Sequence, residues 1–473
     1  MAATATEKRL LVGGEWVETG DWIDVRSPYS GDVVGRVPKA GADETRKAID
    51  AAAEAMRDPL PAHKRAEILV KVAGYLGRRH EEAAATICAE AGKPLKTARV
   101  EASRAMSTYT MAAVQARTLA GDVVPMDASQ AGEGKLAFTL RVPIGVVGAI
   151  SPFNFPLNLV AHKIAPALAA GCAVVLKPAT ATPLSALLLA ELEQEAGLPP
   201  GWLNVVAGSS AEIGDVLVGD ERVAALTFTG SGDVGWKLKE RAPRKHVALE
   251  LGNATPAIVE ADADLEDAAA RLAGNAFSFA GQSCISVQRI YVARDAYDGF
   301  LERFLPRVEA LVVGDPADEL TDVGPLIDGD AKDRVLEWIA ESGGEVLTGG
   351  DVTDDGLIRP TVIANATLDM KVCREEVFGP VAVVNTYESL DEAIALANGT
   401  RYGLQAGIFT GDIRVALRAA KRLEFGGVTV NEAPTFRSDQ MPYGGVKDSG
   451  NTREGPAYSV HELTEPRVVV IDL

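Results

Sequence analysis

The sequence contains few of the residues that build disulfide frameworks and metal centres. Among its 473 residues there are four cysteines and five histidines. The cysteines are far apart and show no metal-type spacing, and the histidines are scattered. We therefore expect neither a disulfide framework nor a zinc site, and the scarcity of cysteine favours a reducing compartment.

Long apolar segments are also missing. The longest uncharged apolar run, residues 164–176, is too short to span a bilayer and contains Pro166 and Gly171. The first nine residues, MAATATEKR, lack the apolar core of a signal peptide. These absences predict a soluble, cytoplasmic protein.

Basic residues are outnumbered by acidic ones. The 47 Lys and Arg residues and the 66 Asp and Glu residues leave a formal net charge of −19. A chain this acidic repels nucleic-acid phosphates and anionic lipids, so we expect no nucleic acid and no membrane among its partners. Apolar residues, in contrast, make up 47% of the chain, which is enough for large cores. Its length of 473 residues predicts two to four domains.

The first 141 residues change their pattern twice. Short strands are predicted within residues 10–37, and helices follow them. Residues 121–141 then carry extended segments, which predict a hairpin inserted between two parts of one domain. The expected helices are 42–56, 62–77, 80–91 and 95–119.

Strands and helices alternate regularly between residues 143 and 251, which predicts a doubly wound parallel sheet with ligands at the carboxyl ends of its strands. A second such series, between residues 253 and 431, is long enough for its own core. The apolar run 468–471 predicts a C-terminal strand that needs a sheet edge, such as one on a neighbouring subunit. The expected strands are 144–150, 172–176, 203–206, 224–229 and 246–251, then 257–259, 285–292, 357–363, 381–387 and 427–431.

One cysteine stands where a predicted helix gives way to a strand. Cys284 precedes the strand 285–292, and Gly281 lets the backbone turn tightly beside it. A cysteine exposed at such a junction can act as a thiolate nucleophile. The alternative, commoner for a lone cysteine, is a small buried apolar residue.

A glycine-rich turn, GSGDVG at residues 230–235, follows the strand 224–229 and opens a helix. This context is typical of dinucleotide binding, because glycines permit close approach and the helix N-terminus offers free N–H groups to a pyrophosphate. The alternative is a tight strand–helix turn. In a simple version of this fingerprint, Glu250 at the end of the next strand binds a ribose hydroxyl.

Two further polar residues follow predicted strands. Lys177 ends the strand 172–176 and can hold the ribose or phosphate of a cofactor, unless it is a surface lysine. Asn154 lies in the rigid loop PFNFP, residues 152–156, where its amide is a suitable oxyanion donor. The alternative for Asn154 is a turn residue that bonds its own backbone.

Taken together, seven motifs in order resemble the aldehyde dehydrogenase superfamily over nearly the whole chain. The stretch 435–445 looks most like the branch that oxidises small polar or anionic aldehydes, such as lactaldehyde, succinic semialdehyde and phosphonoacetaldehyde. The motifs are SPFNFP (151–156), KPA (177–179), GSGDVG (230–235), LELG (249–252), GQSC (281–284), EEVFGP (375–380) and PYGGVKDSG (442–450).

The resemblance implies an α/β fold with a Rossmann-type cofactor domain formed by residues 1–120 and 142–252. It further implies a second α/β domain, the catalytic one, at residues 253–455. A small β element, residues 121–141 and 456–473, is expected to join subunits in a homodimer or homotetramer.

The resemblance also implies roles for individual residues. Cys284 attacks the aldehyde, and Asn154 with the Cys284 N–H holds the oxyanion. Glu250 activates the water that hydrolyses the thioester, so the resemblance favours a general base over a ribose ligand there. Lys163 matches a lysine proposed to relay a proton. The expected cofactor contacts are Ser151, Phe153, Lys177, Thr180, Gly230, Ser231, Glu376 and Phe378.

Position 180 bears on the choice of cofactor. Many relatives that prefer NAD have a glutamate there, which binds the ribose hydroxyls and repels a 2′-phosphate. Because Thr180 lacks this charge, we expect either NAD or NADP to serve, with NADP accepted.

The substrate pocket is expected to be polar. Asn158 and His162 are four residues apart, hence on one helical face, which should border the aldehyde. Together with Arg437 and Arg104, they predict a short substrate with a hydroxyl, carboxylate, phosphonate or sulfonate. The alternative is that His162 is a core histidine and Arg437 pairs with Asp439.

Two other functions are weighed against this one. Relatives that transfer the acyl group to coenzyme A generally lack the glutamate found here at position 250. A non-catalytic relative would have lost Cys284, Asn154 or Glu250, and all three are present.

Overall fold

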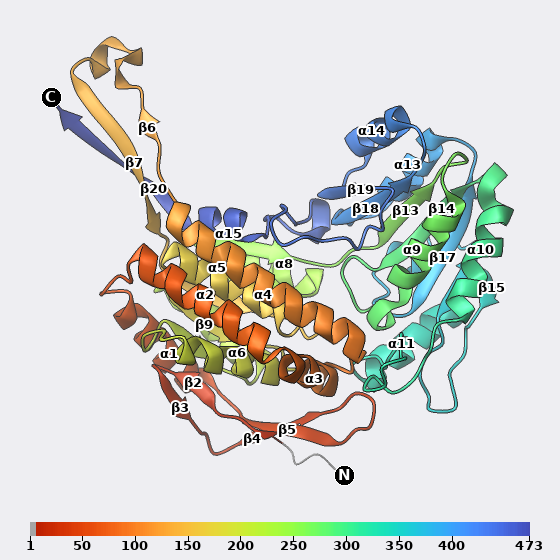
Figure 1. Cartoon of the computed structure of the whole chain (residues 1–473), viewed down its shortest axis with the longest axis horizontal. Coiled ribbons are helices and arrows are strands. Elements are labelled where there is room, and N and C mark those ends of the chain that lie inside the picture. The colour runs from red at the N-terminus through yellow and green to blue at the C-terminus, as the bar shows by residue number, and fades with distance from the viewer. Residues whose placement is uncertain (1–5) are drawn as a thin grey trace.

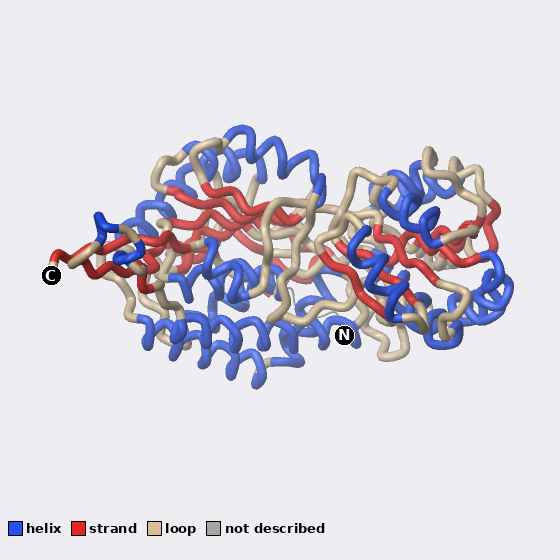
Figure 2. Tube along the Cα trace, turned by 90° about the horizontal axis from the view of Figure 1, so that it is seen from above, coloured by secondary structure: helices blue, strands red, loops and turns tan. Residues whose placement is uncertain are grey.

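Two seven-stranded sheets form the cores of the two halves of the chain (Figure 1). The structure is a computed structural model that describes residues 6–473. Residues 1–5 of the N-terminal stretch MAATATEKR lie outside the described residues. Seen from above, the strands of each half lie between helices (Figure 2).

The first sheet has the strand order β12-β11-β8-β9-β10-β2-β3. Strands β12 to β10 are parallel, whereas β2 and β3 extend the sheet antiparallel. The chain runs outward from β8 through β9 to β10 and then returns to β11 on the other side of β8, so the strand order reverses at β8. The bounds are β2 (Leu10–Val12), β3 (Glu15–Val17), β8 (Val146–Ile150), β9 (Val174–Lys177), β10 (Leu203–Val205), β11 (Val223–Thr229) and β12 (His246–Glu250).

Helices cover both faces of this sheet, and one of them is buried throughout. All thirteen residues of α5 are buried, including the polar Asn158, His162 and Lys163. Fully buried polar side chains need partners, so α5 brings an electrostatic cluster into the core. The helices are α1 (Ala42–Ala55), α2 (Ala62–Arg78), α3 (His80–Ala91), α4 (Leu95–Thr118), α5 (Asn158–Ala170), α6 (Leu184–Glu195), α7 (Ser210–Gly219) and α8 (Gly232–Arg241).

The second sheet has the order β15-β16-β17-β14-β13-β18-β19, parallel except for β15 at its edge. Its central strand β14 is buried at every residue, as expected for a parallel strand covered on both faces. The strands are β13 (Thr255–Val259), β14 (Val287–Ala293), β15 (Glu345–Thr348), β16 (Thr361–Ala364), β17 (Val381–Tyr387), β18 (Gln405–Phe409) and β19 (Gly427–Val430). The helices are α9 (Leu265–Phe277), α10 (Tyr297–Glu309), α11 (Gly329–Ala340), α12 (Lys371–Arg374), α13 (Leu390–Asn398) and α14 (Ile413–Arg422).

A third sheet projects from the first half as an arm that carries the C-terminus (Figure 1). In it β20 (Thr464–Asp472) pairs antiparallel with the whole of β7 (Lys135–Pro143), which also pairs with β6 (Val123–Val124). The predicted C-terminal strand is confirmed, and β7 of the same chain supplies the sheet edge that it needs. Val468 and Val470 in this arm remain more than half exposed.

A small sheet and several short elements complete the chain. The sheet has the order β1-β5-β4. Within residues 6–473, none of the helices combines the length and the hydropathy needed to traverse a bilayer. The remaining elements are β1 (Thr6–Glu7), β4 (Trp22–Arg26), β5 (Val33–Pro38), α15 (Pro456–Glu462) and the 3₁₀ turns η1 (Met126–Ala128), η2 (Gln130–Gly132), η3 (Ser278–Gly281), η4 (Arg294–Ala296) and η5 (Lys447–Ser449).

The predicted α/β alternation is confirmed, with shifts of a few residues at element ends. The strand expected from residue 144 begins at Val146, because Gly145 (φ +136°) separates it from β7. The strand expected at 357–363 is confined to β16, since Pro360 has no N–H for the ladder. Four longer elements were not predicted: α11, β15, β18 and α14.

Candidate active site

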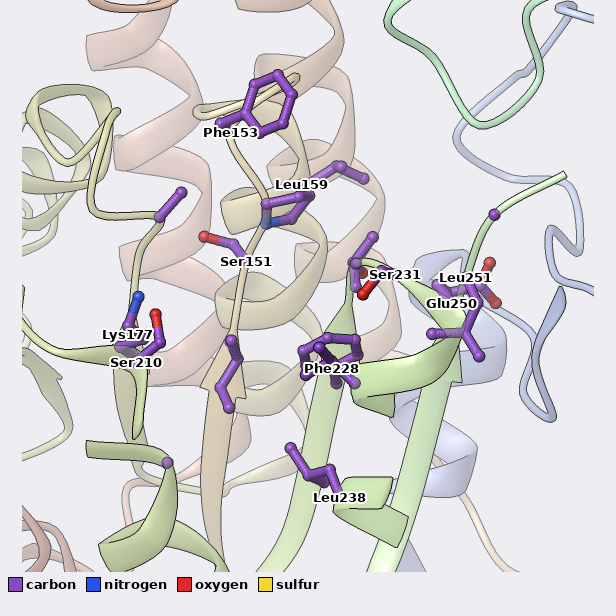
Figure 3. Close-up of a pocket in the computed structure, with 18 of the residues that line it drawn as sticks. Ser151, Phe153, Leu159, Lys177, Ser210, Phe228, Ser231, Leu238, Glu250 and Leu251 are labelled. Atoms are coloured by element: carbon purple, nitrogen blue, oxygen red, sulfur yellow. The ribbon is translucent and has the colours of Figure 1, made fainter. Parts of the chain in front are cut away.

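A cavity of about 770 Å³ opens at the carboxyl ends of β8, β9, β11 and β12, where the strand order of the first sheet reverses. Loops from the second half of the chain close its other side. In Figure 3, Lys177 and Ser210 lie on one side of Ser151, and Glu250 lies on the other. Eleven of the fifteen predicted site residues line the cavity: Ser151, Phe153, Asn154, Lys177, Thr180, Gly230, Ser231, Glu250, Cys284, Glu376 and Phe378.

An unusual backbone turn brings Cys284 to this cavity. Phe279, Ala280 and Gly281 have successive φ values of +50°, +53° and +70°. A side chain at Gly281 would collide with the carbonyl oxygen of Gly379, so only glycine fits there. The turn ends helix α9 and directs the following residues toward the first sheet.

The thiol of Cys284 is held in its neutral form. Its Sγ atom lies 2.9 Å from the Tyr443 hydroxyl. Burial raises the pKa of the thiol to about 12, although the Tyr443 hydrogen bond and the charge of Arg437 act in the opposite direction. Ionisation at neutral pH therefore requires a base or an additional positive charge beside the sulfur.

Asn154 approaches the Cys284 loop from β8. Its Nδ2 donates to the carbonyl oxygen of Gln282 at 3.0 Å, two residues before the cysteine. Its buried Oδ1 has no hydrogen-bond partner within the described chain. Both the amide and the sulfur thus belong to one small region of the cavity wall.

A buried ion pair fixes the two loops together. Lys93 pairs with Glu101, whose Oε1 accepts the N–H groups of Leu157 and Asn158 at 2.9 and 3.1 Å. The Lys93 ammonium lies 3.6 Å from the ring centroid of Phe155 in the Asn154 loop and 4.6 Å from that of Phe279 in the Cys284 loop. Cation–π attraction to both rings makes this lysine a bridge between the loops.

Glu250 is a buried carboxyl group without hydrogen bonds. It ends β12, and neither of its oxygens has a partner among residues 6–473. Burial, helped by the charge of Glu454, raises the pKa of Glu250 well above its usual range, against the opposing charges of Arg437 and Lys163. A carboxyl group with a raised pKa is a stronger base once ionised, which suits it to proton transfer.

Glu376 also lines the cavity, close to the residues that follow Glu250. Its Oε1 accepts the backbone N–H of Asn253 at 3.1 Å, and burial raises its pKa to about 7. A side chain at position 252 would displace this carboxylate, because a Cβ atom there would lie 2.3 Å from Glu376 Oε2. The ring of Phe378 meets that of Phe153 edge to face, with centroids 5.8 Å apart.

The remaining cavity wall carries polar groups with free hydrogen-bonding capacity. Ser231 is the N-cap of α8, yet its side chain makes no cap hydrogen bond, and the Ser151 hydroxyl has no partner in residues 6–473. Lys177 donates to the carbonyl oxygen of Pro178 at 3.0 Å, and burial lowers its pKa to about 8. The Thr180 hydroxyl donates to the carbonyl oxygen of Gly208 at 3.0 Å.

Four predicted site residues, Lys163, Asn158, His162 and Arg437, do not line the cavity. Three of them join Arg104, Asp439 and Glu454 in a set of linked ionisable groups that we name the charge cluster. Lys163 Nζ donates to Thr229 Oγ1 at 2.6 Å and lies 3.4 Å from Glu454 Oε1. The members of the charge cluster are Arg104, His162, Lys163, Arg437, Asp439 and Glu454.

Arg437 pairs with Glu454, at 3.1 Å, and not with Asp439 as the alternative prediction had it. Asp439 instead lies 3.1 Å from Arg104 and 3.2 Å from His162. Burial acts to raise the pKa of Glu454, but the charges of Lys163 and Arg437 overcome it and lower that pKa to about 2. The carboxylate is therefore ionised at any pH near neutrality.

The predicted helical face of Asn158 and His162 is confirmed. Thr108 on α4 binds both side chains, with its hydroxyl 3.2 Å from Asn158 Oδ1 and 3.2 Å from His162 Nε2. Burial and the charge of Arg437 lower the pKa of His162 to about 4, so this imidazole is neutral at physiological pH. Its Nδ1 has no hydrogen-bond partner in the described part of the chain.

Comparison with known proteins decides the family. The sequence profile of the aldehyde dehydrogenase family matches residues 16–469. This chain belongs to the aldehyde dehydrogenase family. It is thus an oxidoreductase that uses NAD or NADP to convert aldehydes to acids.

Three relatives illustrate the match. A 3-sulfolactaldehyde dehydrogenase of Priestia aryabhattai is 45% identical over 98% of both chains. The crystal structure of aldehyde dehydrogenase 21 from Physcomitrella patens, in complex with the reaction product succinate, covers 99% of both chains with 41% identity and a TM-score of 0.96. A glyceraldehyde-3-phosphate dehydrogenase from Methanocaldococcus jannaschii, complexed with NADP, shares 40% identity and a TM-score of 0.92 over 97% of this chain and all of its own.

Several residues around the dehydrogenase cavity had no predicted role. Tyr443 lies in the motif PYGGVKDSG, but nothing in the sequence pattern pointed its hydroxyl at the sulfur. Glu454 follows Arg453 near the C-terminus and has the local character of a surface residue. Lys93 is fully buried despite its charge, and a single sequence gives no sign of such burial.

Proposed function

We propose that this dehydrogenase oxidises a short anionic aldehyde to its carboxylic acid, with Cys284 as the nucleophile and Glu250 as the general base. The observation that carries the proposal is that one cavity is lined by the Cys284 sulfur, the Asn154 amide and the Glu250 carboxyl group, from three separate segments. Such a set can add a thiol to a carbonyl, stabilise the oxyanion and activate water.

In the first step the thiol of Cys284 loses its proton and the sulfur bonds to the aldehyde carbon. The raised pKa of Glu250 makes its carboxylate a suitable acceptor for that proton. The aldehyde oxygen becomes an oxyanion, for which the Asn154 amide and the Cys284 backbone N–H are the nearest preorganised donors. The Asn154 amide donates one N–H to the Gln282 carbonyl, and its second N–H remains for the oxyanion.

The cavity fits a nicotinamide dinucleotide. The N-terminus of α8 offers Ser231 and the turn at Gly230 to a pyrophosphate. The Ser151 hydroxyl, which has no partner among residues 6–473, and the Lys177 ammonium are proposed to meet the adenosine side. Glu376 is placed to hold a ribose hydroxyl, with Phe153 and Phe378 beside the nicotinamide end. When bound, NAD(P)+ supplies the two-electron oxidation that turns the thiohemiacetal on Cys284 into a thioester.

Hydrolysis of the thioester needs a water activated by a base. Glu250 has two free oxygens in a largely apolar wall, which supports that role. Lys163 Nζ lies 3.4 Å from Glu454, and burial lowers its pKa, which supports the predicted role in passing protons from Glu250 toward the interior. The cavity shields the thioester from other nucleophiles.

The charge cluster supports an anionic substrate. Arg104 Nε, Arg437 Nε and His162 Nδ1 are buried nitrogens without partners among residues 6–473. Their residues are neighbours, because Asp439 contacts both Arg104 and His162, and His162 Nε2 lies 3.3 Å from Arg437. Three relatives act on, or release, molecules with a sulfonate, a carboxylate or a phosphate. A short aldehyde bearing such a group would complete the hydrogen bonding of these nitrogens.

Both cofactors are proposed to serve, with NADP accepted. Position 180 is a threonine whose hydroxyl is occupied by Gly208, so no carboxylate repels a 2′-phosphate there. Lys177 and Lys237 line the cavity and supply positive charge, and Arg241 lines it as the partner of Asp215. The binding of NADP by the Methanocaldococcus relative is consistent with this assignment.

The proposed organisation follows the sheets. Residues 1–120 and 142–252 hold the cofactor, residues 253–455 bring the nucleophile, and residues 121–141 with 456–473 join subunits. The exposed valines of the arm support an assembly into a homodimer or homotetramer. The cytoplasm is the proposed location, because the scarcity of cysteine suits a reducing compartment.

The test is a panel of short aldehydes, with and without an anionic group, assayed for NADH and NADPH formation without coenzyme A. We expect turnover of the anionic members, and loss of activity in both Cys284→Ser and Glu250→Gln, because the second variant lacks the acceptor for the thiol proton as well as the base for the water. Turnover only with coenzyme A would support the acylating alternative. No reduction of either cofactor would support a non-catalytic protein.

A further inference from the structure

The sulfur of Cys284 has a dedicated partner. Among residues 6–473, only Tyr443 forms a hydrogen bond with it, and the same hydroxyl has no second partner. The tyrosine is 3% exposed, so bulk water does not compete for its hydroxyl. A buried hydroxyl that has a neutral thiol as its sole partner gains little to offset its desolvation. A thiolate is a much stronger acceptor, so the same hydroxyl would form a stronger bond once the sulfur is ionised.

Tyr443 is rigidly placed. Its backbone exchanges two hydrogen bonds with Glu454, of 2.9 and 2.6 Å, which ties it to the charge cluster. Its ring packs against Ile285 and Leu404. With both backbone and ring held, the hydroxyl stays at the sulfur.

The next residue in the chain touches the proposed base. A Cβ atom on Gly444 would lie 2.7 Å from Glu250 Oε1, so this carboxylate packs directly on the Gly444 backbone. One short segment, residues 443–444, therefore sets the position of the sulfur and the wall behind the base.

The electrostatic surroundings favour Tyr443 as the donor. The Arg437 guanidinium lies 3.8 Å from the centroid of the tyrosine ring, and a cation over the ring draws electron density from it and strengthens the O–H as a donor. Burial raises the pKa of Tyr443 well above its usual range, so the phenol keeps its proton. The other charged or titratable groups that face the sulfur are Glu250, Glu376 and Arg437.

We propose that Tyr443 is a catalytic hydrogen-bond donor to the sulfur of Cys284. The inference rests on the proposed role of Cys284 as nucleophile. In the resting enzyme the thiol donates to the tyrosine oxygen. When the thiol proton passes to Glu250, the phenol O–H rotates to donate to the thiolate, and no bond to tyrosine forms or breaks.

The first test removes only the hydroxyl. In Tyr443→Phe we expect alkylation of Cys284 by iodoacetamide at pH 7 to slow about 10- to 100-fold, the factor typical of losing one hydrogen bond to a charged group. Peptide mapping, with Cys284→Ala as the blank, assigns the alkylated residue. The value of kcat/KM should fall by a similar factor for anionic and for uncharged aldehydes, because the donor acts on the sulfur and not on the substrate.

A second test varies the acidity of the donor with almost no change in shape. Replacement of Tyr443 by 3-fluorotyrosine makes the phenol a stronger donor, so alkylation at pH 7 should become faster than in the wild type. A role in packing alone predicts no dependence on phenol acidity. Tyr387→Phe is the matched control, because that buried hydroxyl donates to the Val259 carbonyl in the second sheet, and its loss should leave alkylation unchanged.

The outcomes separate the inference from the function on which it rests. If Cys284→Ala keeps dehydrogenase activity, the proposed nucleophile is wrong and the inference falls with it. If Cys284→Ala is inactive but Tyr443→Phe and the fluorotyrosine enzyme react at the wild-type rate, the inference alone is overturned. Slower alkylation in the first and faster alkylation in the second support it.

Discussion

The cavity and the charge cluster both adjoin Glu250, but they differ in how their buried polar groups are paired. In the cavity wall, Ser151, the Asn154 carbonyl group and both oxygens of Glu250 lack partners in the described structure. In the charge cluster, every acid is paired with a base: Glu454 with Lys163 and Arg437, and Asp439 with Arg104 and His162.

We infer that the unpaired groups of the cavity wall take part in the reaction, whereas the paired groups of the charge cluster stabilise the fold around it. An unpaired buried group costs stability, so it persists where a ligand or reacting atom completes it. A fully paired network fixes geometry and sets the local field. The few unpaired nitrogens in the charge cluster, on Arg104, Arg437 and His162, are therefore its most informative atoms.

The largest effect is expected from breaking the charge cluster at its centre. Glu454→Gln leaves Lys163 and Arg437 without their shared counter-ion, and a broken buried pair costs about 3 to 5 kcal/mol. Because the pKa of Glu454 is lowered to about 2, its stabilising effect is present above about pH 4.5 and is lost as the pH falls toward 2. Thermal unfolding should thus show a difference from the wild type at pH 7 that shrinks below pH 4.5.

Glu432→Gln is the matched control for this variant. Its pair with Arg271 is about one-third exposed, so the loss should be below about 1 kcal/mol. Equal destabilisation by the two variants would mean that the buried pairs of Glu454 contribute no more to the free energy of unfolding than an exposed pair does.

The next effect concerns the substrate. In Arg104→Gln we expect kcat/KM for anionic aldehydes to fall about 100-fold, near 2.7 kcal/mol, and kcat/KM for uncharged short aldehydes to stay within about twofold. Steady-state kinetics with matched aldehyde pairs measures the ratio. Arg99→Gln on the same helix, which removes ion pairs with the exposed Glu81 and Glu319, should change neither value. A similar loss for both aldehyde classes in Arg104→Gln would place the anion elsewhere.

A smaller effect should follow from adding a charge to the cavity itself. In Thr180→Glu the new carboxylate repels a 2′-phosphate, so kcat/KM with NADP should fall relative to NAD by about 30-fold, roughly 2 kcal/mol. The two cofactors are compared in the same assay at equal aldehyde concentration. An unchanged ratio would show that residue 180 does not contact the adenosine ribose.

The smallest effect tests whether a raised pKa alone marks the site. Glu193 is buried far along α6, accepts the Tyr109 hydroxyl at 2.6 Å, and has its pKa raised by burial to about 7, much like Glu376. The folded protein keeps this proton while the unfolded chain loses it near pH 4.3, so stability falls as the pH rises from about 4.5 to 7.

Glu193→Gln should leave activity unchanged, which is the smallest effect of this series, and should flatten that pH dependence by about 3 kcal/mol, the equivalent of a pKa raised from 4.5 to about 7. Denaturant unfolding at pH 5 and pH 8 measures the change. An equal slope in the two proteins would mean that Glu193 titrates as it does in the unfolded chain.

The sequence predicted the first half of the fold closely, because alternating strands and helices are encoded by local apolar patterns. Residues 143–251 show this, since each expected strand and helix was found there within a few residues. Helix α14 was missed for the opposite reason: it has four basic residues in ten, and only Ala416 and Ala419 are buried. Two alanines make a weak apolar stripe.

The charge cluster was beyond sequence reasoning. Its pairs join Arg104 with Asp439 and Lys163 with Glu454, whose partners meet only after the second half of the chain folds onto the first. The sequence did suggest that Asn158 and His162 share a face, because that relation is local to one helix. It could not tell whether Arg437 would choose Asp439 or Glu454, which depends on the path of the loop between them.

The ammonium group of Lys93 is clamped between an aromatic ring of the Asn154 loop and one of the Cys284 loop. Because Lys93 contacts both loops, a movement of one loop would move the other. The distance between the oxyanion donor and the nucleophile therefore depends on the position of Lys93 at the junction of α3 and α4. Gly92, immediately before the lysine, abuts Pro325, whose carbonyl oxygen accepts from Gln282 beside the nucleophile. Substitutions at the junction of α3 and α4 would therefore shift both loops and alter the reaction, although the junction itself does not line the cavity.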